Sequence, residues 1–321
     1  HEGPATALLG DSKVRPTSAS PSLPVTITDT QGTRVRITDT SRVLALDLYG
    51  TLSRTVFELG QGDRLVGRDL STQFAEAGKL PLVTPSGHDL SAEAILGLDP
   101  TLIITDTSLG PWDVILQLRD AGIPVVVTES TRNLSNIKTI TGQVAAALGV
   151  PTAGDELSQR IQAEIDDVSA QIKQIAPSDE GTKLRAVFIY ARGKSGVYYL
   201  FGEDSGADSL ITALGMYDVA GEIGWQGSKP LTDEGIVSAQ PDLILMMDRG
   251  EDPATVAAEL FGNAAIGLTK ALAKELAQTG ITVSSKSGSP CPSRVGQKRT
   301  ATSIWLRTMS SVSFVADRRT S

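Results

Sequence analysis

The sequence predicts an α/β protein with two lobes, each built on a central, mainly parallel sheet, joined by one long α-helix. Three observations predict this fold. Short apolar strands alternate with amphipathic helices along most of the chain, which is typical of parallel sheets covered by helices. Two stretches, residues 90–100 and 231–241, resemble each other. A purely helical pattern separates the two regions.

The two similar stretches share an order of residue types. Each begins with Leu followed by Ser or Thr, has a Glu two residues later (Glu93 or Glu234), and ends on a Pro before an apolar strand. Their separation is too large for a small solenoid repeat and suits two similar lobes. Two lobes are expected to enclose a cleft, and such a cleft is expected to bind a ligand.

The first lobe is expected over residues 25–131, after a flexible Ser/Pro/Gly-rich leader at residues 1–24. A hairpin is predicted around Asp29–Gly32, because polar turn residues separate two alternating segments. The further strands are expected at 43–46, 64–66, 102–105 and 125–128, and the helices at 51–60, after Ser91 and at 112–121.

A helical linker is expected over residues 132–177. Its long helix is predicted by apolar residues that recur every three or four positions, namely Leu157, Ile161, Ile165, Val168, Ile172 and Ile175. Pro177 is expected to end it. A helix of some 20 residues spans roughly 30 Å, so it predicts a rigid connection.

The second lobe is expected over residues 178–272, with strands at 184–190 and 243–245 and a helix near 207–214. The last part, residues 273–321, is predicted to be an atypical, poorly structured tail. From Ser284 onward it carries seven Lys or Arg against one acid.

Composition excludes several classes of protein. A net charge of −8 argues against a nucleic-acid binder, and no apolar run is long enough to span a membrane. Cys291 is the only cysteine, so neither an internal disulfide nor a thiolate zinc cluster is possible. No charged segment followed by an apolar one begins the chain, so any export signal is expected to have been removed.

Few residues offer chemistry beyond packing. His88, in the loop before Ser91, is the only histidine besides His1. Tyr190 ends a predicted strand, where open α/β sheets bind ligands, and Arg192 two residues later can stabilise a phenolate. The alternative is that His88 is an ordinary surface residue and Tyr190 an ordinary residue at a strand end.

Glu93 and Glu234 occupy matching first helical turns, where acids are also favoured by the helix dipole alone. No P-loop, HExxH, GxSxG or paired metal-ligand motif is present.

At this point the chain resembles the substrate-binding proteins of bacterial ABC importers for haem, cobalamin and iron-siderophores, in particular actinobacterial haem-binding lipoproteins. The segments that carry the resemblance are residues 41–47, 62–68, 87–93, 189–193 and 196–202. The resemblance implies the class III periplasmic-binding-protein fold, without enzymatic activity, and transport of haem for iron acquisition.

The resemblance also implies roles for single residues. His88 and Tyr190 become the axial ligands of the haem iron, with Arg192 bonded to the phenolate. Glu93 and Glu234 become contacts with the importer permease.

The resemblance implies further partners and a location. Upstream cell-surface haem receptors are expected partners, and attachment to the membrane as an extracytoplasmic lipoprotein is expected, with the anchor cysteine absent from the chain. The protein is assumed to be a monomer.

Further cleft residues are expected from their chemistry. Tyr49, Tyr198 and Trp225 can form apolar walls, and Arg68 can meet the haem propionates. The sequence departs from the family after about Leu272, where the family's last strand, turn and helix are replaced by the basic tail, so an incomplete second lobe is expected.

Two other functions remain open. A siderophore or corrinoid receptor of the same importer class would not need His88. A doubly wound oxidoreductase is the alternative from another class, although the glycine fingerprint of dinucleotide binding is missing.

Overall fold

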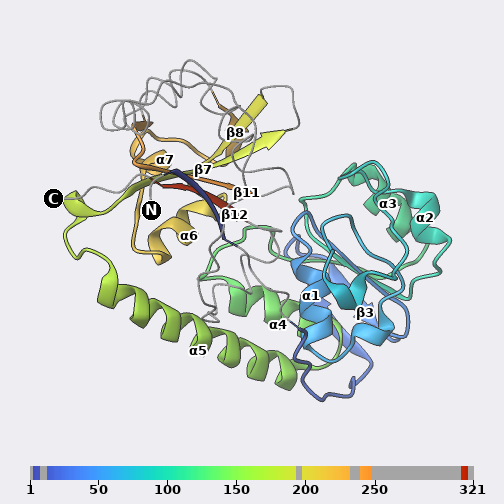
Figure 1. The fold of residues 1–321 in the computed structure, drawn as a ribbon. Helices are drawn as coiled ribbons and strands as arrows, with labels where there is room; N and C mark the ends of the chain where they lie inside the picture. Colours follow the sequence, from blue (N-terminus) through green and yellow to red (C-terminus); the bar gives the residue numbers. More distant parts are fainter. Residues whose placement is uncertain (1–2, 8–12, 193–196, 232–238, 248–311, 317–321) are drawn as a thin grey trace. The chain divides into compact units, whose positions relative to one another are not determined.

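The computed structural model describes residues 3–7, 13–192, 197–231, 239–247 and 312–316 (Figure 1). The chain divides into two compact units, with the boundary between Asp166 and Asp167. The N-terminal unit comprises Gly10–Asp166, and the C-terminal unit comprises His1–Leu9 and most of the chain from Asp167 onward. The boundary falls within the region that the sequence predicts as a helical linker.

Three short apolar strands form the parallel sheet of the N-terminal unit, in the order β4 (Val43–Leu46), β5 (Leu102–Thr105) and β6 (Val125–Val127). Every residue of these strands is buried. The sequence predicts them to within one residue, because a strand covered on both faces is a continuous apolar run.

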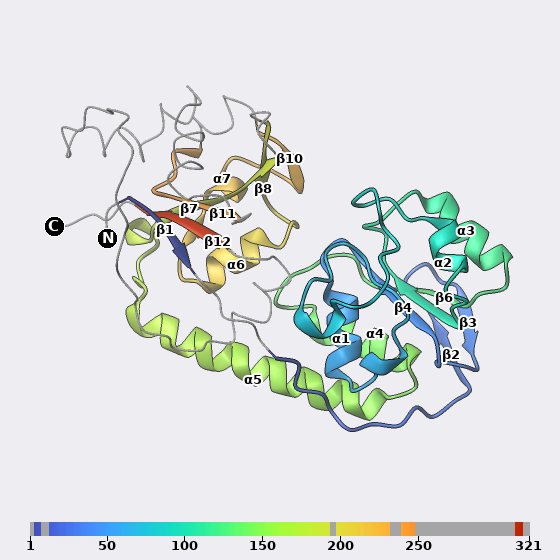
Figure 2. The same ribbon diagram turned by 45° about the vertical axis from the view of Figure 1, so that its right-hand side comes forward.

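Helices cover both faces of this sheet (Figure 2). One face packs against the hairpin of β2 (Val25–Thr28) and β3 (Arg34–Ile37) and against α1 (Thr51–Glu58), α4 (Ile137–Ala147) and the start of α5 (Pro151–Ile175). The other face packs against α2 (Ala92–Leu96) and α3 (Trp112–Asp120). Neighbouring residues of a strand point to opposite faces, so Val43 and Ala45 belong to the first core and Leu44 and Leu46 to the second.

The predicted strand at 64–66 is wrong. The structure has a short 3₁₀ helix there, η1 (Gly62–Arg64), followed by a single bridge between Leu65 and Val43. Two further 3₁₀ turns are η2 (Ala75–Ala77) and η3 (Glu180–Thr182). An apolar run of two residues buries too little to extend a ladder beyond that bridge.

The leader predicted as flexible is held in place over residues 13–24. The backbone N–H of Thr17 donates to the carbonyl of Glu58 (2.8 Å), and that of Ser22 donates to the carbonyl of Gly149 (2.8 Å). The Arg15 guanidinium lies 2.6 Å from the Glu164 carboxylate. Backbone hydrogen bonds to distant segments leave no trace in composition, which explains the wrong prediction.

The long helix α5 has 25 residues and ends two residues before Pro177. Its apolar stripe is buried at Leu157 and Val168, whereas Ile175 is 84% exposed. None of the helices in the described ranges combines the length and the hydropathy that a membrane-spanning helix needs.

The C-terminal unit is built on a mixed sheet in which most pairings are antiparallel, so the prediction of a mainly parallel sheet is wrong for this unit. Its order is β1 (Gly3–Ala7), β12 (Val312–Ala316), β11 (Leu243–Met247), β7 (Arg185–Arg192), β8 (Val197–Phe201) and β10 (Ser228–Pro230). β7 pairs in parallel with β11 and with β9 (Tyr217–Asp218), and the other pairings are antiparallel. Four residues join β7 to β8, too few for the crossover that parallel strands need.

Two short helices, α6 (Ala207–Ala213) and α7 (Val219–Glu222), complete the described part of this unit. Its core gathers Val187, Ile189, Leu200, Ile244 and Met246. The tail predicted as poorly structured contains β12, which pairs with β11 and β1, so the prediction is wrong for Val312–Ala316.

Removing the side chain at the centre of the N-terminal sheet tests this packing. We expect Ile103→Ala, at a fully buried position of β5, to lower the free energy of unfolding by about 2–5 kcal/mol, because the cavity cannot collapse between helical layers. Urea unfolding followed by circular dichroism measures this change. Leu116→Ala, on α3 and 44% exposed, is the control and should change it by less than about 0.5 kcal/mol; equal losses in both variants would contradict the layered core.

Candidate functional site

Polar residues follow each strand of the N-terminal sheet directly. Asp47 comes after β4, Asp106 after β5, and Thr128 after β6. The strands are parallel, so these residues meet at one edge, the side on which open α/β sheets bind ligands. Both carboxylates are completely buried.

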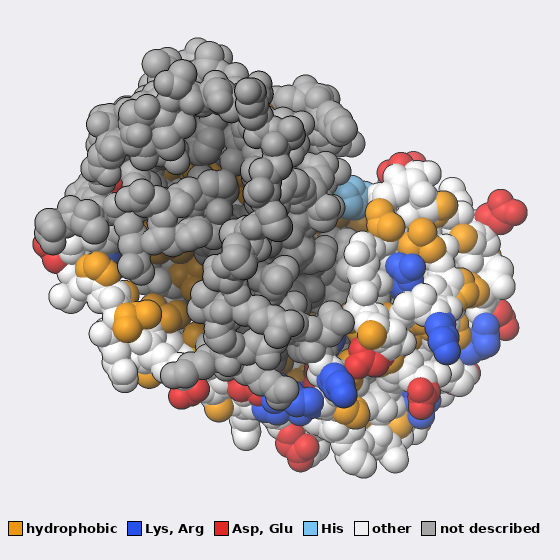
Figure 3. All heavy atoms as spheres, viewed as in Figure 1, with side chains coloured by type: hydrophobic (Ala, Val, Ile, Leu, Met, Phe, Trp, Pro, Cys, Tyr) orange, Lys and Arg blue, Asp and Glu red, His pale blue; other side chains and the backbone are white. Residues whose placement is uncertain are grey.

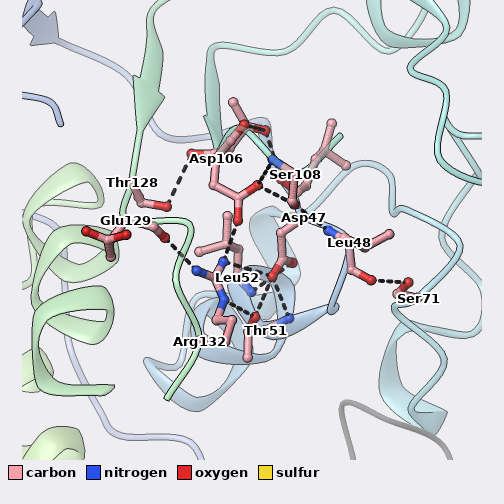
Figure 4. A network of polar contacts seen from close by, with 12 residues as sticks. Asp47, Leu48, Thr51, Leu52, Ser71, Asp106, Ser108, Thr128, Glu129 and Arg132 are labelled. Carbon is pink, nitrogen blue, oxygen red and sulfur yellow. Dashed lines mark hydrogen bonds and ion pairs between the residues drawn. The ribbon is translucent and has the colours of Figure 1, made fainter. Parts of the chain in front are cut away.

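Arg132 lies between these carboxylates (Figure 4). One nitrogen, Nη2, donates to Asp47 Oδ2 (3.1 Å) and to Asp106 Oδ2 (2.7 Å), and Nη1 donates to the carbonyl of Glu129 just after β6. The side chain is 3% exposed. One guanidinium therefore connects the carboxyl ends of all three strands, and charge-assisted hydrogen bonds in such a buried place are strong.

Asp47 also determines where α1 begins. Its Oδ2 accepts from the backbone N–H of Thr51 (3.2 Å) and its Oδ1 from that of Leu52 (3.2 Å). Before the helix, Gly50 has a φ of 68°, and a Cβ there would lie 2.8 Å from the Ser71 carbonyl oxygen. Only glycine fits this turn without strain.

A third buried carboxylate extends the network. Asp69 Oδ2 accepts from the backbone N–H of Asp47 (3.2 Å), and its Oδ1 accepts from the backbone N–H (2.8 Å) and the hydroxyl (3.0 Å) of Thr72. The neighbouring Leu70 N–H donates to the Thr84 hydroxyl (2.9 Å). The network thus reaches Thr84, where the loop that carries His88 begins.

Three carboxylates near one guanidinium leave an excess of negative charge in a buried place. Burial, followed by the charge of Asp47, raises the pKa of Asp69 to about 7. Burial and Asp47 also raise the pKa of Asp106 to about 6, against the opposing effect of Arg132. Burial raises the pKa of the Tyr49 phenol as well.

The predicted residues Tyr49 and Arg68 lie at this edge. The Tyr49 ring is half-buried, with its centroid 5.2 Å from the Arg132 guanidinium carbon. Arg68 uses Nη1 on the carbonyls of Asp69 (3.2 Å) and Thr72 (3.3 Å). Arg68 therefore donates some of its hydrogen bonds to carbonyls of its own loop.

His88 is an exposed side chain on an anchored backbone. Its carbonyl accepts from the N–H of Gly110 (3.4 Å), the Gly110 carbonyl accepts from Leu90 N–H (2.6 Å), and Leu90 is 5% exposed. The side chain is thus presented to solvent from a fixed loop. Glu93 is exposed in the first turn of α2, behind Ser91, whose hydroxyl accepts from the Ala94 N–H (3.2 Å) as a helix cap.

In the C-terminal unit, Tyr190 is half-buried in β7, which extends two residues beyond the predicted end. It pairs with Tyr199 of β8. Tyr198 belongs to the opposite face of this ladder and packs, with Trp225, against the core around Ile189.

The remaining predicted residues of the C-terminal unit are Trp225, Arg192 and Glu234. The indole N–H of Trp225 donates to the Leu200 carbonyl (3.0 Å). The backbone of Arg192 belongs to β7, but its side chain lies outside the described residues, as does Glu234.

In the view of Figure 3, acidic and basic side chains of the described residues are interspersed with apolar ones.

The sequence model of the periplasmic binding protein family matches residues 48–275. The chain belongs to this family. Its members bind solutes and do not convert them, in agreement with the prediction that the protein is no enzyme. The α/β fold predicted for this class is confirmed.

Individual relatives agree with this assignment. The chain is 38% identical to the crystal structure of heme binding protein HmuT, over 83% of this chain and 85% of that one, with a TM-score of 0.77. It is 31% identical to the periplasmic heme-binding protein RhuT from Roseiflexus sp. RS-1, over 74% and 88% of the two chains, with a TM-score of 0.64.

A third relative is an uncharacterized ABC transporter substrate-binding lipoprotein, YvrC of Bacillus subtilis (strain 168), with 25% identity over 70% of this chain and 69% of its own. Solved HmuT variants replace a histidine, a tyrosine, and an arginine two positions after that tyrosine.

The buried network was missed at the level of sequence. Asp47 and Asp106 directly follow apolar strands, and this position is a usable signal for a polar site at a sheet edge. Arg132 and Asp69 carry no such signal, because each lies in an irregular segment whose path only the folded chain fixes.

The raised pKa of Asp69 predicts an unusual pH dependence of stability. An unfolded chain ionises Asp69 near 3.8, whereas the native state does so near 7. Between these values the native state holds a proton that the unfolded chain has lost, so raising the pH weakens the native state. We expect Asp69→Asn to remove this loss between pH 5 and pH 8.

Urea unfolding at pH 5, 6, 7 and 8 measures the slope of unfolding free energy against pH. The slope is the test, because Asn also changes the hydrogen bonds of this site. Asp113→Asn, at an exposed position of α3, is the control and should keep the wild-type slope. An unchanged slope in Asp69→Asn would mean that Asp69 does not hold the proton.

Proposed function

We propose that this protein is the haem-binding, substrate-binding protein of an ABC importer, which delivers haem to the membrane permease for iron acquisition. The 38% identity to HmuT over most of both chains carries the proposal. It is supported by a histidine and a Tyr-x-Arg in this chain, the same residue types that the HmuT variants replace.

His88 and Tyr190 are the proposed axial ligands of the iron. His88 is exposed on an anchored loop of the N-terminal unit, and Tyr190 lies near the end of β7 in the C-terminal unit. A phenolate is a hard anionic ligand suited to ferric iron, and Arg192, two residues later, is the proposed hydrogen-bond partner that keeps the phenolate deprotonated.

The residues around the cargo are proposed on chemistry and position. Tyr49 supplies an aromatic surface at the sheet edge, and Arg68 a positive charge for the propionates. Tyr198 and Trp225 lie on the face of β7 and β8 opposite to Tyr190, so their proposed part is to support the ladder that carries Tyr190.

Delivery requires a partner and a location. Glu93 and Glu234 are the proposed contacts with basic residues of the permease, one from each unit. Cell-surface haem receptors are proposed to hand haem to this protein. Attachment as a lipoprotein is proposed by analogy with the Bacillus subtilis relative.

Titration of the protein with haemin, followed by absorbance, tests the proposed function. We expect a Soret band typical of ferric iron with His and Tyr ligands. His88→Ala should shift the band, and Tyr190→Ala should weaken binding by about 10–100-fold, because the anionic ligand is lost. Asp89→Ala, beside His88, and Tyr217→Phe are the matched controls and should titrate as the wild type.

The absence of any spectral change in the wild type would overturn the haem assignment. Binding of a ferric siderophore in place of haemin would assign the protein to the other cargo of this importer class.

Docking is tested apart from cargo binding. The double variant Glu93→Lys, Glu234→Lys should abolish haem transfer to the reconstituted importer and leave the haemin titration unchanged, because the two proposed contacts serve the permease and not the cargo. Asp113→Lys, another exposed acid of the N-terminal unit, is the control. Loss of haemin binding in the double variant would show that these residues serve the cargo site.

A further inference from the structure

The buried network around Arg132 contains neither of the proposed iron ligands, and it connects the carboxyl ends of the three strands of the N-terminal sheet. It connects β4 through Asp47, β5 through Asp106 and β6 through the Glu129 carbonyl. Within the described residues, no three His, Cys, Asp or Glu side chains gather as a metal site requires. The carboxylates of Asp47 and Asp106 accept hydrogen bonds from Arg132, and that of Asp69 accepts from the Asp47 backbone.

Hydrogen bonds hold the segment 48–51 at both of its ends (Figure 4). The Leu48 N–H donates to the Ser108 hydroxyl (2.9 Å), and the Leu48 carbonyl accepts from the Ser71 hydroxyl (2.6 Å). At the other end, the Thr51 hydroxyl accepts from Arg132 Nε (2.9 Å) and donates to Asp47.

Tyr49 is therefore carried by a turn that is fixed on both sides. Gly50 brings the turn against the Ser71 backbone, where no other residue fits. The guanidinium of Arg132 lies against the Tyr49 ring, 5.2 Å from its centroid, within the range of a cation–π contact. A half-buried ring held this way loses little conformational freedom when a ligand binds.

We propose that Tyr49 is the flat contact of the N-terminal unit for a planar aromatic cargo, and that Arg132, with Asp47 and Asp106, is the positioning residue that fixes its ring. This inference rests on the proposed function and deepens it, since it assigns recognition of the macrocycle to Tyr49 and leaves the iron to His88 and Tyr190. Aromatic rings prefer offset-stacked or edge-to-face contacts, which require a defined ring orientation.

The ionisation of Tyr49 agrees with this role. Burial raises the pKa of its phenol, so the ring stays neutral at physiological pH. The raised pKa disfavours the phenolate form that would bind ferric iron, and the ring remains available for contact with the macrocycle.

Two probes separate the macrocycle from the iron, namely haemin and iron-free protoporphyrin IX, each titrated by fluorescence quenching. We expect Tyr49→Ala to weaken the binding of both by the same factor, about tenfold. His88→Ala should weaken haemin and leave the iron-free porphyrin unchanged. Tyr49→Phe keeps the ring and should bind both as the wild type does.

Arg132→Lys tests the positioning role, because lysine keeps the charge that Asp47 and Asp106 need and loses the planar fork. We expect it to weaken porphyrin binding in the wild-type background and to have no further effect in Tyr49→Ala. Such non-additivity is the signature of a residue that acts through its neighbour. A merely structural role for Arg132 would weaken binding equally in both backgrounds.

Ser108→Ala is the second variant, in case Arg132→Lys does not fold. It removes the acceptor of the Leu48 N–H without changing a charge, and should reproduce the same non-additive loss at a smaller size.

The failures of the two proposals are distinguishable. Wild-type protein that binds neither porphyrin sinks the proposed function. Wild-type protein that binds both, with Tyr49→Ala unchanged, sinks the role of Tyr49 alone. A loss in Tyr49→Phe as large as in Tyr49→Ala would assign the effect to the hydroxyl and overturn the flat contact.

Discussion

Arg132 is a positive charge that is almost completely removed from water, and such a charge is tolerated only when it is paired and hydrogen-bonded. Asp47 and Asp106 supply the pairing, and each comes directly after a strand of the N-terminal sheet. The cost of burying the arginine is therefore offset only when the three strand ends lie in register. This requirement ties the position of this sheet edge to the packing of the whole unit.

The ion pairs of Arg132 leave more negative than positive charge in the buried network, and protonation of carboxyl groups reduces this excess. Asp69 and Asp106 have raised pKa values because burial and the neighbouring Asp47 disfavour their ionised forms. Perturbed carboxyl groups often mark catalytic sites, but ion-pair networks perturb pKa values too. In a family that binds solutes without converting them, we infer that these carboxyl groups hold the edge of the N-terminal sheet rigid.

The two units present their proposed iron ligands in different ways. His88 extends from a loop whose backbone is bonded on both sides of the side chain, whereas Tyr190 belongs to a strand inside a mixed sheet. Coordination needs ligands whose positions vary little, and both arrangements fix the backbone that carries the side chain. The loop of His88 is also connected, through Thr84 and Leu70, to the segment that Asp69 holds.

The pattern of the sequence was enough to predict the central strands of the N-terminal unit and the long helix. The apolar runs of β4, β5 and β6 and the helical stripe of α5 follow from periodicity, because periodicity reports which faces of an element are buried. The loop position of His88 and the strand position of Tyr190 follow from the same patterns. The contact of Arg132 with Asp47, 85 residues earlier in the chain, and the path of residues 13–24 along the N-terminal unit emerge only in the folded protein. Such contacts join irregular segments, which have no period, so the pairing of their charges and backbone groups is fixed only when the packed sheet brings them together.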